Sequence, residues 1–255
     1  LRTRGRDDLS GCRSSYPEFL RFEPGGATTP AELAEDLACV ARAGAGGCGF
    51  EQPLEAALKA VTPSTSSLRF FRDTAGHGDG ANAGFLRSDS IFVPVMLTDE
   101  DDCSVRDPGL FDLDDTRFDP DPNLRCAVHP EALHPLSRFV DGLLALRDDP
   151  ADVIVAPIVG IPPDLEGAGF GSILSDPRME VRVERDGSTP LVPSCDVPER
   201  GRAFPPRRIV RVAEAVADRG GGAVVGSLCQ ASYDAPIDAI LSRVLDRLGA
   251  VCAAP

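Results

Sequence analysis

The chain of 255 residues lacks several features that would assign a protein to a class at once. It has no apolar run near the roughly 20 residues that a membrane helix needs. It does not begin with Met, and its opening residues, LRTRGRDDLSG, contain no apolar signal-peptide core. We therefore expect that a leader has been removed or that the sequence is part of a longer reading frame, and we favour the second.

Basic residues are also few. The chain has 26 Lys and Arg against 40 Asp and Glu, a formal charge of −14, and Lys59 is the only lysine. Neutralising a phosphate backbone requires clustered Lys and Arg. The charge therefore argues against nucleic acid as a partner.

Signatures of catalysis are sparse. With only three histidines in the chain, a Ser–His–Asp triad has no positional support. His129 and His134 are five residues apart with Pro130 between them, so they do not form a helical zinc pair, and we expect loop or helix-start positions for both. The stretch GFGSILS does not have the G-x-S-x-G spacing of a nucleophile elbow. The Gly-rich stretches lack both the lysine of a Walker motif and the G-x-G-x-x-G pattern of dinucleotide-binding loops.

No cysteine pair has the C-x-x-C spacing, which excludes the common zinc and thioredoxin-like motifs. The chain has eight cysteines, and this even number indicates disulfides and an oxidising compartment rather than buried thiols. Proximity along the chain predicts Cys39–Cys48 and Cys103–Cys126; Cys195–Cys229 is plausible, and Cys12–Cys252 is what remains. The eight positions are 12, 39, 48, 103, 126, 195, 229 and 252.

Apolar periodicity predicts alternating helices and strands. Thr29 as N-cap and Pro30 at the first helical position mark one helix start. The run 153–159 is apolar throughout, as in a strand buried on both faces. Helices are expected near 30–43, 50–61, 133–144, 205–216 and 237–248, and strands near 19–22, 91–97, 153–159 and 223–228.

This alternation predicts an α/β fold with an open, mostly parallel, doubly wound (Rossmann-like) sheet and helices on both faces. Residues 1–18 are expected to be irregular, and residues 19–252 to form a single domain. Within it, residues 162–204 are expected to be an irregular insertion with a small hairpin around 179–187.

Four acids follow the apolar strand at 91–97, in the sequence LTDEDDC. Ligands of open α/β sheets bind at the carboxyl ends of strands, and carboxylates suit hard cations such as Mg²⁺ or Ca²⁺. Acids at the end of a strand can, however, also be solvated by water without binding a metal. The stretch DLDDTRFDPDPN, which lacks the Gly and Glu of an EF-hand loop, gives only a weak second indication of Ca²⁺.

Two blocks of sequence carry a family resemblance. The order GGCGFEQPLEAAL (46–58), followed by VPVMLTDEDD (93–102), resembles the middle of a von Willebrand factor A (VWFA) domain. Further stretches such as LHPLSRFVDGLLALR and VAPIVGIPP are most similar to secreted or lipid-anchored A-domain proteins of myxobacteria. The resemblance implies a doubly wound sheet with a metal-ion-dependent adhesion site, in which Asp99 is a metal ligand.

The sequence departs from the family pattern in two respects. The family's Thr loop falls on the stretch around Cys48, where no Thr occurs, and the family's Asp-x-Ser-x-Ser motif is missing. The resemblance therefore implies that the first strands of the family fold are absent. It also implies that the metal site is incomplete, with Asp99 as one ligand and Glu100, Asp101 and Asp102 as solvated neighbours.

The resemblance implies a non-enzymatic, extracytoplasmic domain, either periplasmic, an outer-membrane lipoprotein or secreted. It would bind an unknown protein or cell-surface ligand through a divalent cation, Mg²⁺ with Ca²⁺ or Mn²⁺ as alternatives. Two other functions stay open. One is a metal-dependent α/β hydrolase using Asp99, Glu131 or a histidine, and the other is a scaffold whose acidic loops maintain solubility.

Overall fold

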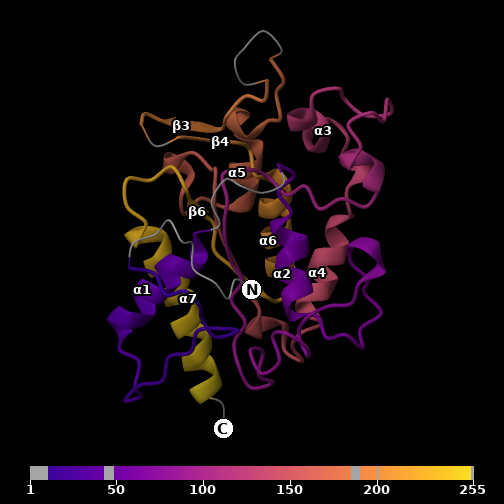
Figure 1. Ribbon diagram of the computed structural model, residues 1–255. Coiled ribbons are helices and arrows are strands. Elements are labelled where there is room, and N and C mark those ends of the chain that lie inside the picture. Colours follow the sequence, from indigo (N-terminus) through magenta and orange to yellow (C-terminus); the bar gives the residue numbers. More distant parts are fainter. Residues whose placement is uncertain (1–10, 43–48, 185–189, 200, 254–255) are drawn as a thin grey trace. The chain divides into compact units, whose positions relative to one another are not determined.

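The computed structural model describes residues 11–42, 49–184, 190–199 and 201–253. Within these residues the chain contains seven α-helices and an open, partly parallel sheet, so the expected α/β class is confirmed (Figure 1). Contacts divide the chain into two compact units. One contains Leu1–Cys48 and Lys59–Arg87, and the other contains Gly49–Leu58 and Ser88–Pro255.

The larger unit is organised around one buried strand, β2 (Ile154–Val159). All six of its residues are buried, as the continuous apolar run predicts. Strand β1 (Val95–Leu97) pairs with it in parallel, with Val95 opposite Ala156 and Leu97 opposite Ile158. Pro94, which has no N–H, precedes β1 and accepts a hydrogen bond from Ala156 at 3.0 Å.

The third strand of this sheet is broken. β5 (Gly222–Ala223) pairs in parallel with the beginning of β2, and β6 (Gly226–Ser227) pairs in parallel with its end. Strand formation near 223–228 is thus confirmed only in two short pieces. Both lie on the opposite edge of β2 from β1, so β2 is the central strand.

Two long helices contact β2. Helix α6 (Arg207–Asp218) buries Ile209, Val212 and Val216 at the expected spacing, and it also packs against α4 (Leu136–Leu144). Helix α7 (Asp234–Ala253) buries Ile240 against β2, whereas Leu241 and Leu245 are more than half exposed. The apolar stripe of α7 is therefore only partly used in the core.

Short elements occupy segments that the sequence pattern left irregular. They are α3 (Pro122–Val128), α5 (Phe170–Ser175) and the antiparallel pair β3 (Cys195–Val197) with β4 (Gly201–Ala203). An antiparallel bridge joins Val183 to Leu191, so the described ends of the expected hairpin do pair. The predicted turn, at Asp186-Gly187, lies outside the described residues.

The smaller unit contains α1 (Pro30–Ala41) and the last turn of α2 (Pro53–Val61), which begins in the larger unit. Thr29 caps α1 as predicted and forms a capping box with Glu32. The strand predicted at 19–22 is wrong, because these residues form no strand. Instead, the Phe19 ring packs edge-on against Phe85 with centroids 5.6 Å apart.

Three disulfides lie among the described residues. Cys103–Cys126 and Cys195–Cys229 confirm two predicted pairs, with Cα atoms 5.4 and 6.5 Å apart. The pairs Cys39–Cys48 and Cys12–Cys252 are wrong, because Cys12 is bonded to Cys39. Separation along the chain misled here, since the segment before α1 folds back onto it. Cys48 and the Cys252 side chain lie outside the described residues.

These bonds indicate that the protein folds in an oxidising compartment, in agreement with the even cysteine count. In the described ranges, none of the helices combines the length and the apolar character needed to cross a bilayer.

Candidate functional site

The acids that follow β1 have two different fates. Asp99 and Glu100 are exposed, whereas Asp101 is half-buried and Asp102 is only 1% exposed. The expectation that Glu100, Asp101 and Asp102 are solvated neighbours is therefore wrong for the last two. Their environments explain why.

Asp101 caps α6 from a distant part of the chain. Its carboxylate accepts hydrogen bonds from the backbone N–H of Arg208 at 3.0 Å and of Ile209 at 3.2 Å. Pro206, which precedes α6, supplies no side-chain cap. The first N–H groups of a helix lack intrahelical partners and favour negative charge, so Asp101 replaces the missing local cap.

Asp102 and Ser104 cap α2 in the same way. The Asp102 carboxylate accepts hydrogen bonds from Leu54 N–H at 3.1 Å and from the Ser104 hydroxyl at 2.6 Å. The Ser104 hydroxyl in turn accepts one from Glu55 N–H at 3.1 Å. Arg208 completes the set, with its Nη2 3.3 Å from Asp102. A buried carboxylate requires such partners, so Asp102 is a structural residue.

Desolvation raises the pKa values of both Asp101 and Glu100. Burial raises the pKa of Asp101 to about 7, although hydrogen bonds from Arg208, Asp102 and Ile209 oppose the shift. The pKa of Glu100 is also raised, first by desolvation and then by the negative charges of Asp99 and Glu51. Asp99 and Glu51 therefore each lie close enough to Glu100 for their charges to act on it.

Asp99 and Glu100 line different hollows of the larger unit. Asp99 borders a cavity of about 350 Å³, together with Thr98, Arg202 and Tyr233. Its backbone carbonyl accepts a hydrogen bond from Phe204 N–H at 2.7 Å, which fixes the strand end next to β4. The guanidinium of Arg202 is paired with Asp196 at 3.1 Å. The carboxyl end of β1 thus presents the Asp99 side chain to solvent.

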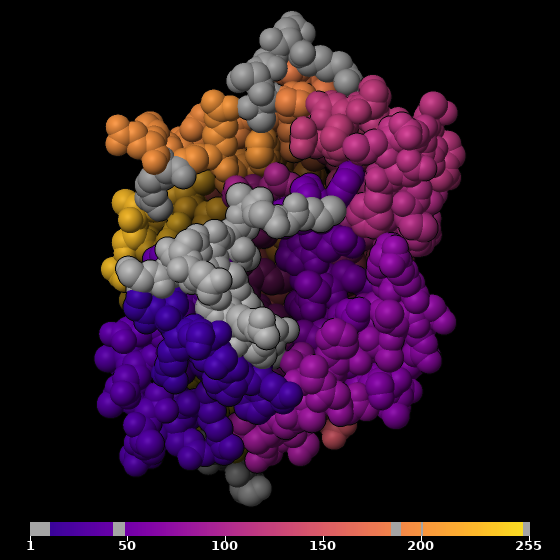
Figure 2. Space-filling view, in the orientation of Figure 1, coloured from indigo at the N-terminus to yellow at the C-terminus, as the bar shows by residue number. Residues whose placement is uncertain are grey.

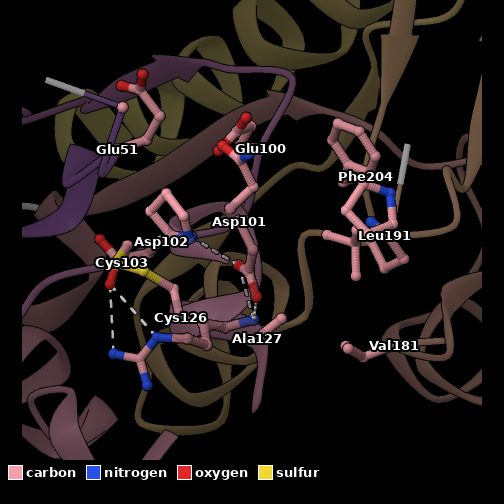
Figure 3. A pocket seen from close by; sticks show the side chains of 16 residues that line it. Glu51, Glu100, Asp101, Asp102, Cys103, Cys126, Ala127, Val181, Leu191 and Phe204 are labelled. Atoms are coloured by element: carbon pink, nitrogen blue, oxygen red, sulfur yellow. Dashed lines mark hydrogen bonds and ion pairs between the residues drawn. A yellow bond between two sulfur atoms is a disulfide. The ribbon is translucent and has the colours of Figure 1, made fainter. Parts of the chain in front are cut away.

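Glu100 borders a cavity of about 260 Å³ (Figure 3). Val181, Leu191 and Phe204 lie on one side of it, and the Cys103–Cys126 disulfide lies on the other. In the space-filling view the pink segment around α3 and the orange segment that leads to β4 adjoin one another (Figure 2). These two segments supply most of the cavity's apolar lining.

His129, Glu131 and His134, three of the residues considered for hydrolysis, are engaged in structural contacts. The Nε2 atom of His129 accepts a hydrogen bond from Asp119 N–H at 3.0 Å, and its Nδ1 is 3.0 Å from Glu131. His134 lies near Glu55, and Arg138 forms a bidentate ion pair with that carboxylate at 2.7 and 2.9 Å. Burial lowers the pKa of His134. The structure does not bring these histidines together with Asp99 at one cavity.

The Asp-rich loop at 112–121 contains its own cation. The buried guanidinium of Arg125 donates hydrogen bonds to the backbone carbonyls of Leu110, Asp112, Leu113 and Asp119. Arg117 pairs with Asp107 and Asp115. Arg125 therefore organises the backbone of this loop, and Arg117 pairs with one of its acids, Asp115.

Whether the described residues fit a divalent cation depends on how many ligands converge. Asp99 has the right chemistry, because hard cations prefer carboxylate oxygen. However, no group of three or more His, Cys, Asp or Glu side chains in the described part of the chain is arranged to hold a metal ion. Among these four residue types, the described part of the chain thus places no two further ligands beside Asp99.

Comparison with protein-family models, with curated proteins and with solved structures found no match for this chain.

Proposed function

We propose that this chain is an extracytoplasmic binding domain of the VWFA type, which holds a protein or cell-surface ligand at the carboxyl end of its parallel sheet. The observation that supports this proposal is the position of Asp99. It follows β1 directly, its side chain is exposed, and it borders a cavity at the strand end. Open α/β sheets bind ligands at such strand ends.

Asp101 and Asp102 support the same proposal because they hold the strand end in place. Asp101 and Asp102 hold the starts of α6 and α2, so the strand end is fixed by two helices that converge on it. A rigidly placed strand end that still exposes one carboxylate is suited to binding, because the ligand does not have to order it.

A doubly wound, Rossmann-like sheet is part of this proposal. Among the described strands β1 pairs only with β2, which leaves one edge of β1 free. Val95 and Leu97 on β1 are 51% and 64% exposed. Because exposed apolar edge strands promote aggregation, proteins normally cover or pair them. Further strands beside β1, as in the VWFA fold, would pair this edge, and their connecting helices would cover the face on which Val95 and Leu97 lie.

In the proposed site Asp99 supplies one oxygen ligand to Mg²⁺, with Ca²⁺ or Mn²⁺ as alternatives. The other ligands would come from an Asp-x-Ser-x-Ser segment, which this sequence does not contain. The oxidising compartment indicated by the disulfides suits a periplasmic, lipid-anchored or secreted location.

The test is calorimetric titration with Mg²⁺ and Mn²⁺ of the polypeptide, including any residues that precede Leu1 in its gene. We expect saturable binding that Asp99→Asn abolishes and that the matched control Asp114→Asn, at an exposed acid of the Asp-rich loop, leaves unchanged. Equal loss in both variants, or binding that Asp99→Asn does not affect, would contradict the proposal. No binding by the unsubstituted protein would favour the scaffold function instead.

A further inference from the structure

The cavity beside Glu100 combines an apolar wall with an acidic one. Its volume, about 260 Å³, lies just below the range typical of small-molecule sites, so it has room for one extended side chain. Val181, Leu191 and Phe204 form the apolar wall (Figure 3). Four carboxyl groups and the guanidinium of Arg208 also line it.

These four carboxyl groups are not equivalent. Asp101 and Asp102 accept hydrogen bonds from the starts of α6 and α2, and Arg208 pairs with Asp102. Glu51 and Glu100 are exposed, and in the described part of the chain neither carboxylate takes part in a hydrogen bond or ion pair. Two uncompensated negative charges therefore stand at the edge of a cavity where Arg208, the one Lys or Arg among its described lining residues, is already paired with Asp102.

The backbone holds both glutamates in place. The backbone carbonyl of Glu51 accepts a hydrogen bond from Cys103 N–H at 2.7 Å. The next residue, Gln52, accepts one from Val105 N–H at 3.2 Å through its side-chain oxygen. The Glu100 N–H donates to the Thr98 hydroxyl at 3.2 Å. The charges are thus carried on segments that are fixed before any ligand arrives.

We propose that this cavity receives an arginine side chain of a partner protein, with the guanidinium between Glu51 and Glu100 and the aliphatic stem along Val181, Leu191 and Phe204. This inference rests on the proposed function, because it names the chemistry of the protein ligand. It places the contact beside the Asp99 cavity rather than in it.

Arginine fits better than the other cations considered. Its planar guanidinium can bind two carboxylates and stack on an aromatic face, whereas lysine carries a compact, strongly hydrated charge. A divalent cation would leave the apolar wall without a partner. In addition, no three His, Cys, Asp or Glu side chains of the described residues come together to hold a metal ion. An anionic or purely apolar ligand would meet the acidic edge unfavourably.

The test uses two fluorescent peptides, Ac-Gly-Ser-Arg-Ser-Gly and the same peptide with norleucine in place of arginine, in buffer with EDTA. We expect anisotropy to show binding of the arginine peptide with a dissociation constant on the order of 1 mM, and no saturable binding of the norleucine peptide. Glu51→Gln and Glu100→Gln should each weaken binding about fivefold, which is the upper range for exposed ion pairs. Asp114→Asn should leave it unchanged.

The substituted glutamates are exposed, so we expect both variants to fold, which circular dichroism checks. Equal affinity for the two peptides, no binding of either, or arginine binding that Glu51→Gln and Glu100→Gln leave intact would overturn the inference. Because EDTA removes divalent cations, failure here while Asp99→Asn abolishes Mg²⁺ binding refutes only the arginine site. Arginine binding without any cation binding would support this inference and contradict the cation site of the proposed function.

Discussion

The Asp101 carboxylate accepts the backbone N–H of Arg208 with both of its oxygens, each 3.0 Å from the nitrogen, although the two residues are 107 positions apart. Asp101, which follows the end of β1, therefore caps α6, a helix that is distant in the sequence. Asp102 likewise accepts a hydrogen bond at the start of α2, so two of the four acids after β1 hold helices in place. Only Asp99 and Glu100 are left to face solvent.

Replacing Asp101 should weaken the fold. Asp101→Ala removes the cap of α6 and should lower the free energy of unfolding by about 1 kcal/mol, as loss of an N-cap does. Asp101→Asn keeps an acceptor oxygen and should cost less. Urea unfolding followed by circular dichroism measures both. An Asp101→Ala protein as stable as the unsubstituted one would show that α6 does not depend on this cap.

Replacing Asp102 should be more damaging. Asp102→Ala leaves the half-buried Arg208 guanidinium and the Leu54 N–H without their shared acceptor. Breaking a buried charge pair from one side costs about 3 kcal/mol or more. We expect a much lower unfolding midpoint than for the matched control Asp114→Ala, which changes an exposed acid. Midpoints that agree for the two variants would contradict the structural role of Asp102.

Stability should fall in mild acid because of His134. Burial lowers its folded-state pKa below the ordinary value of 6.5, so between these two pKa values the unfolded chain binds more protons. The contribution is fully present above about pH 6.5 and is lost as the pH falls through the folded-state pKa. Urea midpoints at pH 7.5 and 5.5 should diverge more for the unsubstituted protein than for His134→Gln. An equal change in both would exclude His134 as the source.

The disulfide connectivity distinguishes the structure from the order of cysteines in the sequence. Proteolysis without reductant, followed by mass spectrometry, should give the linked peptides Cys12–Cys39, Cys103–Cys126 and Cys195–Cys229. The peptide containing Cys39 is the most informative. If it is linked to Cys48, the fold-back of the segment before α1 is wrong.

Local patterns were sufficient for much of the fold. The apolar run of β2, the Thr29 cap of α1 and the Cys103–Cys126 pair all depend on residues near one another, and each was predicted. The Cys195–Cys229 pair, 34 residues apart, was also predicted, but other features that depend on distant segments were missed. The partner of Cys39 was wrong, and Asp101 and Asp102 were expected in water, because neither the fold-back nor the helix starts that need caps can be placed from local sequence.

One signal for the missed caps was present in the sequence. Pro206-Arg207 and Gln52-Pro53 begin helices without a preceding Ser, Thr, Asp or Asn. Such starts leave N–H groups that must find acceptors elsewhere, and a cluster of acids at a strand end could have been matched to them. Of the four acids after β1, Asp99 and Glu100 are exposed and do not cap a helix, and the proposed cation site uses the first of them.

Paramagnetic broadening by Mn²⁺ tests this assignment most directly. In ¹H–¹⁵N spectra of the polypeptide, with any residues that precede Leu1 in its gene, substoichiometric Mn²⁺ should first broaden the amide signals around Asp99. Asp99→Asn should remove that effect while leaving the spectrum otherwise similar. Broadening centred on the Asp-rich loop at 112–121, or spread evenly over the acidic surface of a protein with a charge of −14, would contradict the proposed site.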